Sequence, residues 1–500
     1  LKAGAATEQR QQRLQRRKRA HEQGRNKQPL IVDLDGTLVR TDTLMEVFVA
    51  TLFVRPFAAL KTLLSLFGGR ARFKRRLTEE YRGDAAATLP YRDDLLAFLK
   101  AQKTKGRSLH LVSAADERIV AAVSDHVALF DSWAGSDGAR NLKGSTKARY
   151  LQETFPDGFA YAGDSLADVA VWRAADEIII ASEDGRVHKS AASLGKPVAA
   201  AFRQPQSTVR TWVRACRLHQ WSKNTLLVIP AILGGLATDL AVMGTIALGF
   251  VAIGLVASGT YILNDLADLN ADRLHPTKRR RPFASGALPI VHGLLAAPLM
   301  VGAGVVIGLL LEPMFAAVLA LYCALTIAYS LRLKRVVLLD AVIIAGLFTL
   351  RLVMGVLLAG VAWSAWLLTF AMFFFLSLAL AKRHVEIKGC IDRGLAVAPG
   401  RGYQAEDAPL TLTLGIANAV ASVQVLVLYL VFEAMPNGLY SSPAFLWVVP
   451  LGVALWAMRI WVLAHRGLLD DDPVVFALRD VLSLALGCAV AVGLALAMTA

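Results

Sequence analysis

The chain has 500 residues, of which 55% are hydrophobic and only 19% are charged, whereas a typical soluble domain is about 25% charged. The formal net charge is +15. This composition excludes a wholly soluble, a disordered or a collagen-like protein. The four cysteines form no Cys-x-x-Cys pair, which argues against a disulfide framework or a zinc site and fits a reducing compartment.

Residues 1–28 form a basic arm that lacks the apolar core of a signal peptide. Such arms bind nucleic acid, are attracted to anionic lipid, or are solvated tails. Because much of the remaining chain is apolar, we expect an anionic membrane surface as the partner, or a plain tail, and no nucleic acid.

Residues 29–200 alternate short apolar runs with helical stretches, which predicts a parallel α/β sheet. Residues 43–85 interrupt this pattern as a pair of helices broken near Pro56 and at Gly68-Gly69. We expect a helical cap over about residues 41–90, either packed on the domain or leaning on the membrane surface. The predicted strands are residues 30–34, 109–112, 159–162 and 178–180.

Polar residues follow several of these strands, and chemistry in such sheets gathers at the carboxyl ends of the strands. Asp33 and Asp35 lie one residue apart and suit a nucleophile on phosphorus and a general acid or base. Carboxylates gathered at one edge need a cation, and oxygen ligands suit Mg²⁺. A turn with a helix cap is the plainer interpretation of the first motif alone. The expected metal ligands are Asp33, Asp35, Asp164 and Asp168, and the expected phosphoryl-binding residues are Ser113 and Lys147.

Four motifs in this region resemble those of the haloacid dehalogenase superfamily of phosphatases: DLDGT at 33–37, LVSA around Ser113, STKARYL around Lys147 and GDSLAD at 163–168. The resemblance implies a Rossmann-like fold with a helical cap. It also implies an aspartyl-phosphate on Asp33, a leaving group protonated by Asp35, and Mg²⁺ bound by Asp164 with support from Asp168. Lys143 competes with Lys147 for the role of the charge-neutralising lysine.

The apolar residues concentrate after about residue 225, and residues 201–500 are expected to form an all-α membrane domain of nine spans. Lys and Arg gather in the loops at 264–288, 332–335, 382–408 and 465–476. The positive-inside rule puts these loops and the N-terminal domain in the cytoplasm, at the inner (plasma) membrane, with the C-terminus outside. The predicted spans are residues 225–238, 241–263, 289–311, 314–331, 336–359, 362–381, 409–432, 444–464 and 477–499.

A second acidic segment, NDLADLNADRLH at 264–275, follows the second predicted span. Spacing by four puts Asn264, Asp268 and Asp272 on one helix face, with Asp265 adjacent. Carboxylates near lipid persist together only if a cation collects them. Basic residues follow at once, so the segment predicts a Mg²⁺-diphosphate site as an alternative to a solvated loop. The expected catalytic and metal-binding residues are Asp265, Asp268 and Asp272, and the expected substrate-binding residues are Asn264, His275, Lys278 and Arg281.

Two more polar clusters fall in the predicted cytoplasmic loops. Each is typical either of positive-inside anchoring or, together with the acidic segment, of the mouth of one cavity. Their expected substrate-binding residues are Tyr329, Lys334 and Asp340 in the first cluster, and Lys382 and Arg383 in the second.

Residues 205–500 resemble the UbiA superfamily of intramembrane prenyltransferases, through the NDxxDxxxDxxH…K…RP…SG string and YSLRLKRVVLLD. Most relatives carry two aspartates four residues apart in the second motif, but here Ile344 follows Asp340. RLHQWSKN at 217–224 is similar to a segment of decaprenyl-phosphate phosphoribosyltransferases, with Leu218 in place of the usual Pro. This branch implies phosphoribosyl diphosphate as donor and a polyprenyl phosphate as acceptor, with binding residues Arg217, Gln220, Lys223 and Asn224.

Together the two resemblances predict a bifunctional enzyme with one Mg²⁺ site in each domain. The membrane half would transfer 5-phosphoribose to the lipid phosphate, and the soluble half would remove the 5-phosphate to give a precursor of cell-wall arabinose. The alternatives are an aromatic prenyltransferase using an isoprenyl diphosphate, with a phosphatase of unrelated substrate, or a soluble half that only senses. A homo-oligomer remains open.

Overall fold

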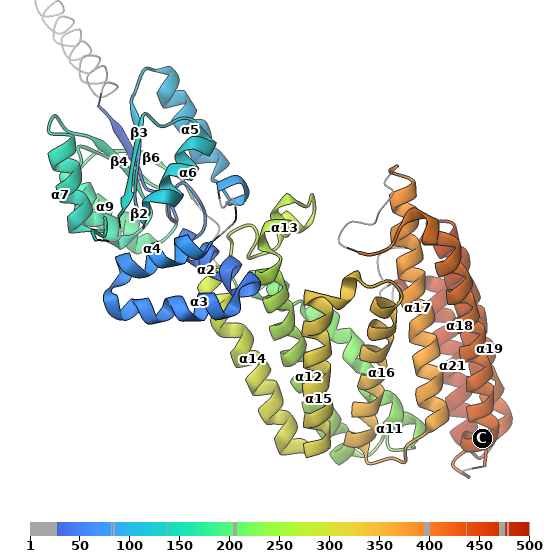
Figure 1. Cartoon of the computed structure of the whole chain (residues 1–500). Helices are drawn as coiled ribbons and strands as arrows, with labels where there is room; N and C mark the ends of the chain where they lie inside the picture. The colour runs from blue at the N-terminus through green and yellow to red at the C-terminus, as the bar shows by residue number, and fades with distance from the viewer. Residues whose placement is uncertain are drawn as a thin grey trace, which may run out of the picture. The chain divides into compact units, whose positions relative to one another are not determined.

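The computed structural model describes residues 28–81, 83, 86–137, 139–203, 208–394, 401–436, 438–469, 476–477 and 480–499 (Figure 1). The contacts within the chain define two units. The first contains Leu1–Cys216 and Asp265–Ala296, and the second contains Arg217–Asn264 and Ala297–Ala500. The predicted basic arm, residues 1–28, lies outside the described residues except for Gln28.

The first unit is built on a six-stranded parallel sheet with the strand order β3-β2-β1-β4-β5-β6. This is the order of a Rossmann-type doubly wound fold, so the predicted α/β class is confirmed. The central strand β1 is apolar and buried throughout, as expected for a strand covered on both faces. The strands are β1 (Leu30–Val32), β2 (Leu109–Asp116), β3 (Ser132–Ser136), β4 (Ala160–Gly163), β5 (Glu177–Ile180) and β6 (Val198–Ala201).

Two hydrophobic clusters cover opposite faces of this sheet, because successive strand residues point to opposite sides. Leu30 and Val32 of β1 pack in one cluster, and Ile31 packs in the other with Trp172. The helices are α5 (Asp93–Thr104), α6 (Glu117–Val127), α7 (Ser145–Thr154), α8 (Val169–Ala174), α9 (Gly185–Ala192) and α10 (Val209–Ala215).

The predicted cap is present between β1 and α5. It consists of α2 (Thr43–Val54), α3 (Pro56–Leu63), the short 3-10 helix η1 (Leu64–Gly68), α4 (Arg70–Glu80) and η2 (Ala86–Thr88). The helices break at Pro56 and at Gly69, as predicted. Val47, Phe73 and Leu77 pack in the core of the sheet, so the cap is anchored on the domain. Phe57 and Phe67 are 86% and 93% exposed, so the cap also carries an apolar surface.

Eight helices in the described part of the chain are long and apolar enough to cross a membrane. They are α12 (Leu240–Ala267), α14 (Ile290–Leu311), α15 (Pro313–Leu331), α16 (Leu339–Ala359), α17 (Ala365–Ile391), α18 (Ala408–Tyr429, extended by η7, Ala405–Asp407, and η8, Leu430–Ala434), α19 (Val448–His465, preceded by η9, Pro443–Trp447) and α21 (Val481–Thr499).

The first predicted span, residues 225–238, is not such a helix. Its residues fall in the 3-10 helix η4 (Leu218–Val228) and the five-residue helix α11 (Ile229–Leu233), after which Gly235 has a φ of 71°. A short segment that ends at a glycine pair cannot supply the about 20 helical residues of a crossing. The described residues therefore contain eight candidate spans rather than the nine predicted. The outside position of the C-terminus assumes an odd number of crossings and stays a prediction.

Small residues let these helices approach closely, as is common in membrane bundles. A Cβ on Gly355 of α16 would lie 2.5 Å from the carbonyl oxygen of Leu227. Ser377 of α17 donates to the carbonyl oxygen of Gly415 at 2.8 Å and accepts from the Trp461 indole at 2.9 Å. These contacts join α17, α18 and α19 within the second unit.

Candidate active sites

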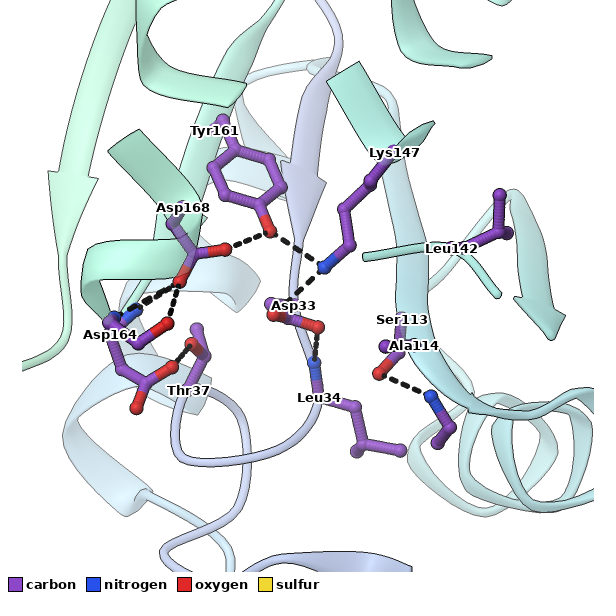
Figure 2. Close-up of polar contacts among 12 residues, drawn as sticks. Asp33, Leu34, Thr37, Ser113, Ala114, Leu142, Lys147, Tyr161, Asp164 and Asp168 are labelled. Carbon is purple, nitrogen blue, oxygen red and sulfur yellow. Dashed lines mark hydrogen bonds and ion pairs between the residues drawn. The ribbon is translucent and has the colours of Figure 1, made fainter. Parts of the chain in front are cut away.

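Three carboxylates converge at the carboxyl ends of β1 and β4. Oxygen atoms of Asp33, Asp164 and Asp168 all lie within 4.8 Å of one another (Figure 2). The strands β1 and β4 are paired neighbours, with Val32 opposite Ala162, so the residues that follow them meet at the strand-order switch point. The predicted convergence of these three side chains is present.

Gly36 makes room for this cluster. Its φ of 72° is in the left-handed region, and a Cβ built on it would lie 2.2 Å from Oδ2 of Asp164. Only a residue without a side chain fits here. The glycine of the DLDGT motif is thus explained by the carboxylate that it faces.

Lys147 of α7 lies against the cluster and is almost completely buried. Its Nζ lies 2.9 Å from Oδ2 of Asp33 and donates to the Tyr161 hydroxyl at 2.9 Å, which in turn donates to Oδ1 of Asp168 at 2.8 Å (Figure 2). Lys143 lines the cavity but is exposed, so the geometry favours Lys147 over its competitor. Tyr161 was missed by sequence reasoning, although a lone tyrosine in an otherwise small and apolar strand is a signal.

Asp168 orients the loop after β4. Its Oδ2 accepts hydrogen bonds from the backbone N–H of Asp164 at 3.2 Å and from the N–H and hydroxyl of Ser165. The hydroxyl of Thr37 donates to Oδ1 of Asp164 at 3.3 Å. These bonds hold the Asp164 carboxylate toward Asp33 before any ligand arrives.

Asp35 lines the same cavity but does not join the three-carboxylate group. Its Oδ1 accepts the backbone N–H of Thr43, the first residue of α2, at 2.8 Å. This contact directs Oδ1 of Asp35 to the cap, and Asp35 as a metal ligand stays a prediction. Burial, reinforced by the nearby Asp42 charge, raises the pKa of Asp35 to about 7. A carboxyl group near neutrality suits proton transfer in both directions.

The cluster fits a divalent cation. Burial raises the pKa of Asp33 and Asp164, and the neighbouring Asp168 charge adds to both shifts. Three close carboxylates repel one another unless positive charge is present, and Lys147 supplies only one charge. An oxygen-only donor set of this kind suits Mg²⁺.

A cavity of about 520 Å³ contains these residues. Ser113, in β2, lines it and accepts the backbone N–H of Ala115 at 3.2 Å. Lys74 of the cap helix α4, which the sequence did not single out, also lines it and donates to the Ala114 carbonyl oxygen and to Asn141. Burial lowers the pKa of Lys74. The cap thus adds a cation to the site.

Another wall of this cavity comes from a distant part of the chain. Residues that lead into and begin the apolar helix α14 line it together with Asp33 and Asp164, namely Gly286, Ala287, Pro289, Ile290 and Val291. A Cβ on Gly286, whose φ is 74°, would lie 2.7 Å from the backbone oxygen and Cβ of Arg40. The approach is therefore close enough to need glycine. The cavity is walled in part by the start of a candidate membrane span.

The second acidic segment is not one straight helix. The helix α12 ends at Ala267, and Asp268 precedes the short helix α13 (Leu269–Leu274) with φ −97° and ψ 12°. The predicted shared face is therefore broken at Asp268. His275 caps the end of α13 and is exposed, and Lys278 is exposed in η5 (Lys278–Arg280).

Arg281 joins two carboxylates of this segment. Its Nη1 lies 3.1 Å from Oδ1 of Asp265 and 2.7 Å from Oδ2 of Asp272, and both aspartates are 2% exposed. Burial raises the pKa of Asp272, although Arg281 counteracts it. In the part of the chain that the structure describes, only the Asp33 group has the spacing of a metal cluster. In the second acidic segment the Arg281 guanidinium links the two carboxylates. A Mg²⁺-diphosphate that binds here must therefore either displace Arg281 from the carboxylates or also contact it.

In the second unit, Asp340 forms a buried polar group with residues of two other segments. Its carboxylate lies 2.9 Å from Nε of Arg383 and accepts the Tyr403 hydroxyl at 2.6 Å. Arg401 donates to the Tyr329 hydroxyl at 2.6 Å and lies 3.8 Å from Asp340. Tyr329, Asp340 and Arg383 are thus brought together as predicted, through arginine and tyrosine residues at 401 and 403. Lys334 and Lys382 are partly exposed.

The 217–224 segment also has defined partners in the second unit. The Arg217 guanidinium lies 4.7 Å from the Tyr261 ring centre, and the Lys223 ammonium lies 5.5 Å from that of Phe348. Asn224 is 1% exposed and accepts from Arg351 at 3.1 Å, so it is a buried support rather than an accessible binding group. Gln220 is half-buried, and Asn264 lies at the edge of this unit, near the end of α12.

These features define a multi-pass membrane protein with an α/β domain that carries a buried carboxylate site. The model of the UbiA prenyltransferase family matches residues 227–497, more than half of the sequence. The chain belongs to the UbiA prenyltransferase family.

Two relatives extend the comparison. The uncharacterized protein y4nM of Sinorhizobium fredii is 44% identical over 473 residues, which are 94% of this chain and 91% of that protein. The match is long enough to include both the soluble and the membrane halves. The decaprenyl-phosphate phosphoribosyltransferase of Mycolicibacterium smegmatis is 36% identical over 188 residues, 37% of this chain and 59% of the relative. The family match and such homologues support a transferase.

Among solved structures, the UbiA homolog from Archaeoglobus fulgidus bound to GPP and Mg²⁺ is similar over 57% of this chain and 98% of that one, with 15% identity and a TM-score of 0.44.

Proposed function

We propose that this protein is a bifunctional membrane enzyme. Its membrane half transfers 5-phosphoribose from phosphoribosyl diphosphate to a polyprenyl phosphate, such as decaprenyl phosphate. Its N-terminal domain, of haloacid dehalogenase type, then removes the 5-phosphate to give polyprenyl-phosphoryl-ribose, a precursor for cell-wall arabinose. The similarity of the membrane half to decaprenyl-phosphate phosphoribosyltransferase and the four phosphatase motifs support this assignment.

The observation that carries the proposal is the shared wall of the Asp33 cavity. Gly286, Ala287 and residues 289–291, at the start of α14, line it together with the proposed phosphatase residues. A phosphatase for soluble metabolites needs no such wall. A lipid-linked phosphomonoester has its polar group at the membrane surface, because its tail cannot leave the bilayer cheaply, at about 0.8 kcal/mol per CH₂. The cavity is therefore suited to a product of the membrane half.

In the transfer step, an oxygen of the lipid phosphate attacks C1 of the ribose. The bond between C1 and the diphosphate oxygen breaks, and the diphosphate leaves with the electron pair. The nucleophile is already anionic, so no general base is needed. Mg²⁺ bound with Asp265, Asp268 and Asp272 would neutralise the leaving diphosphate. Lys278 and Arg281 supply further positive charge, and catalysis consists mostly of positioning and electrostatic stabilisation.

In the hydrolytic step, a carboxylate oxygen of Asp33 attacks phosphorus, and the bond from phosphorus to the ribose 5-oxygen breaks. Asp35 gives its proton to that oxygen, and then accepts a proton from the water that attacks the aspartyl-phosphate. The products are inorganic phosphate and the lipid-linked ribose. Lys147 and Ser113 hold the phosphoryl oxygens, and Mg²⁺ with Asp33 and Asp164 would offset their charge.

The alternative, an aromatic prenyltransferase that uses an isoprenyl diphosphate, is disfavoured by the surroundings of Asp340. In such prenyltransferases the second motif carries two aspartates that bind metal. Here Asp340 is fully buried between Arg383 and Tyr403, and residue 344, where the second aspartate would stand, is isoleucine. That carboxylate already has its counter-charge.

We further propose that the protein resides in the inner (plasma) membrane, with both sites on the cytoplasmic face. The decisive experiment supplies labelled phosphoribosyl diphosphate and polyprenyl phosphate to membranes that contain the protein, and identifies the lipid product by mass spectrometry. Labelled lipid-linked ribose without its 5-phosphate is expected. Labelling only from an isoprenyl diphosphate and an aromatic acceptor would reject the proposal.

A further inference from the structure

A second pocket in the first unit adjoins the Asp33 cavity. Its volume is about 690 Å³. One carboxylate, Asp93, lines it, against five arginines. We call this cavity the arginine pocket, and its arginines are Arg40, Arg214, Arg273, Arg279 and Arg280.

Two of the five arginines have identified partners in the fold. Arg273 is paired with Glu46, and Arg214 donates to the backbone oxygen of Arg280 at 3.1 Å. The Nε of Arg40 is buried and donates to no hydrogen-bond acceptor among the described residues. A buried donor without a partner is costly, which indicates that this position awaits an acceptor.

Arg279 and Arg280 complete the pocket from η5 and are exposed. Neither has an ion pair within the described parts of the chain. Several guanidinium groups around one cavity repel one another, so their excess charge favours an anionic ligand. Guanidinium groups bind phosphate oxygens in a two-pronged geometry, so the matching ligand class is a phosphate ester.

Arg40 links the two sites, because it lines both the arginine pocket and the Asp33 cavity. The two cavities therefore adjoin at Arg40. We propose that the arginine pocket binds the phosphodiester group of the lipid-linked substrate while its 5-phosphate lies at Asp33. This inference rests on the proposed function and names how the phosphatase would select that substrate.

The position of η5 in the chain supports a phosphodiester joined to a lipid. Only nine residues separate Arg280 from Ile290, where the candidate span α14 begins. A phosphate that joins a sugar to a polyprenyl tail lies at the level of the lipid head groups. A loop that directly precedes a membrane span, as η5 does, is held at the same level. A singly charged phosphodiester also suits arginines without a metal ion.

The test uses the full-length protein in nanodiscs and two water-soluble substrates. One is ribose 5-phosphate that carries a methyl phosphodiester at C1, and the other is ribose 5-phosphate with a neutral methyl group at C1. The wild type should hydrolyse the first with the higher kcat/KM. In the double variant Arg279→Ala/Arg280→Ala this preference should fall by about tenfold or more, mainly through KM, since each lost charged hydrogen bond is worth at least that factor.

A matched control is Arg149→Ala/Arg173→Ala, which removes two exposed arginines of the same unit that line neither cavity. It should keep the preference. Arg279→Lys/Arg280→Lys should restore part of it, because charge returns without the two-pronged geometry. An unchanged preference in the alanine variant, while the wild type discriminates, overturns the arginine pocket but leaves the proposed function standing.

The lipid substrate itself separates the remaining outcomes. It is supplied already 5-phosphorylated, in nanodiscs of zwitterionic phosphatidylcholine or with anionic phosphatidylglycerol. A loss in the alanine variant in both kinds of disc supports the proposal. A loss confined to the anionic discs overturns it in favour of a bound lipid head group. No hydrolysis of the lipid by the wild type, with normal hydrolysis of a small phosphomonoester, rejects the proposed function and this inference together.

Discussion

Glu46 of the cap helix α2 and Arg273 of α13 form a buried ion pair with two parallel contacts. Arg273 Nη2 lies 2.6 Å from Oε1 of Glu46, and Nη1 lies 3.0 Å from Oε2. The side chains are 7% and 6% exposed. They come from sequence positions 227 residues apart, and Arg273 directly follows Asp272 of the second acidic segment. The cap beside the Asp33 cavity is thus fastened to the segment that carries the second acidic motif.

This pair gives the first prediction. Glu46→Gln removes one buried charge and leaves the Arg273 guanidinium without its counter-charge, which should lower the free energy of unfolding by about 3–5 kcal/mol. The control is Glu80→Gln, which breaks the exposed Arg55–Glu80 pair and should cost less than about 1 kcal/mol. Thermal unfolding of the first unit in the full-length protein measures both. Equal shifts in the two variants would contradict the importance of the buried pair.

The second prediction concerns Gly36. In Gly36→Ala, the new Cβ would lie 2.2 Å from Asp164 Oδ2 and the backbone would be strained, so the carboxylates must separate. We expect hydrolysis of a small phosphomonoester to fall by at least about 100-fold, since a displacement of about 1 Å has that effect. Gly106→Ala has the same kind of backbone strain, with φ 81°, but nothing within 4 Å. It should unfold earlier yet retain activity, and a similar loss in both variants would point to strain alone.

The third prediction separates the two proposed reactions at Asp33. Asp33→Asn keeps the size of the side chain but removes the nucleophile, so hydrolysis should stop while phosphoribosyl transfer continues. Membranes with this variant should accumulate the 5-phosphorylated lipid, whereas the wild type should yield the dephosphorylated lipid. Mass spectrometry of extracted lipids distinguishes them. The same lipid product from both proteins would mean that the phosphatase acts on something else.

The fourth prediction is the complement at the second acidic segment. Asp268→Asn or Asp272→Asn should reduce phosphoribosyl transfer by more than about 100-fold, because charge stabilisation by a bound metal is worth several kcal/mol. Hydrolysis of a small phosphomonoester should remain. Asp157→Asn, at an exposed position, is the control and should affect neither reaction. Near-normal transfer in both motif variants would show that the donor does not bind at this segment.

Much of the architecture is predictable from the pattern of apolar residues. The strands β1, β2, β4 and β5 are predictable because they are interior strands with short, mostly apolar runs. The two edge strands, β3 and β6, are harder to predict, because β3 consists mostly of small and polar residues and β6 is mostly alanine, which is depleted in strands. The breaks of the cap helices at Pro56 and Gly69 are predictable for a local reason. Proline restricts the backbone, and glycine allows conformations that other residues avoid.

The sequence by itself also determined which residue types serve the chemistry, because the acidic motifs around Asp33, Asp164 and Asp268 each lie at the end of a strand or helix. Only the tertiary structure decided which of them meet. It joins Asp33, Asp164 and Asp168 but turns Asp35 to the cap, it selects Lys147 over Lys143, and it recruits Lys74. It also links Asp265 and Asp272 through Arg281. The reason is physical: spacing along the chain fixes direction within one element, whereas distance between charges depends on how the elements pack.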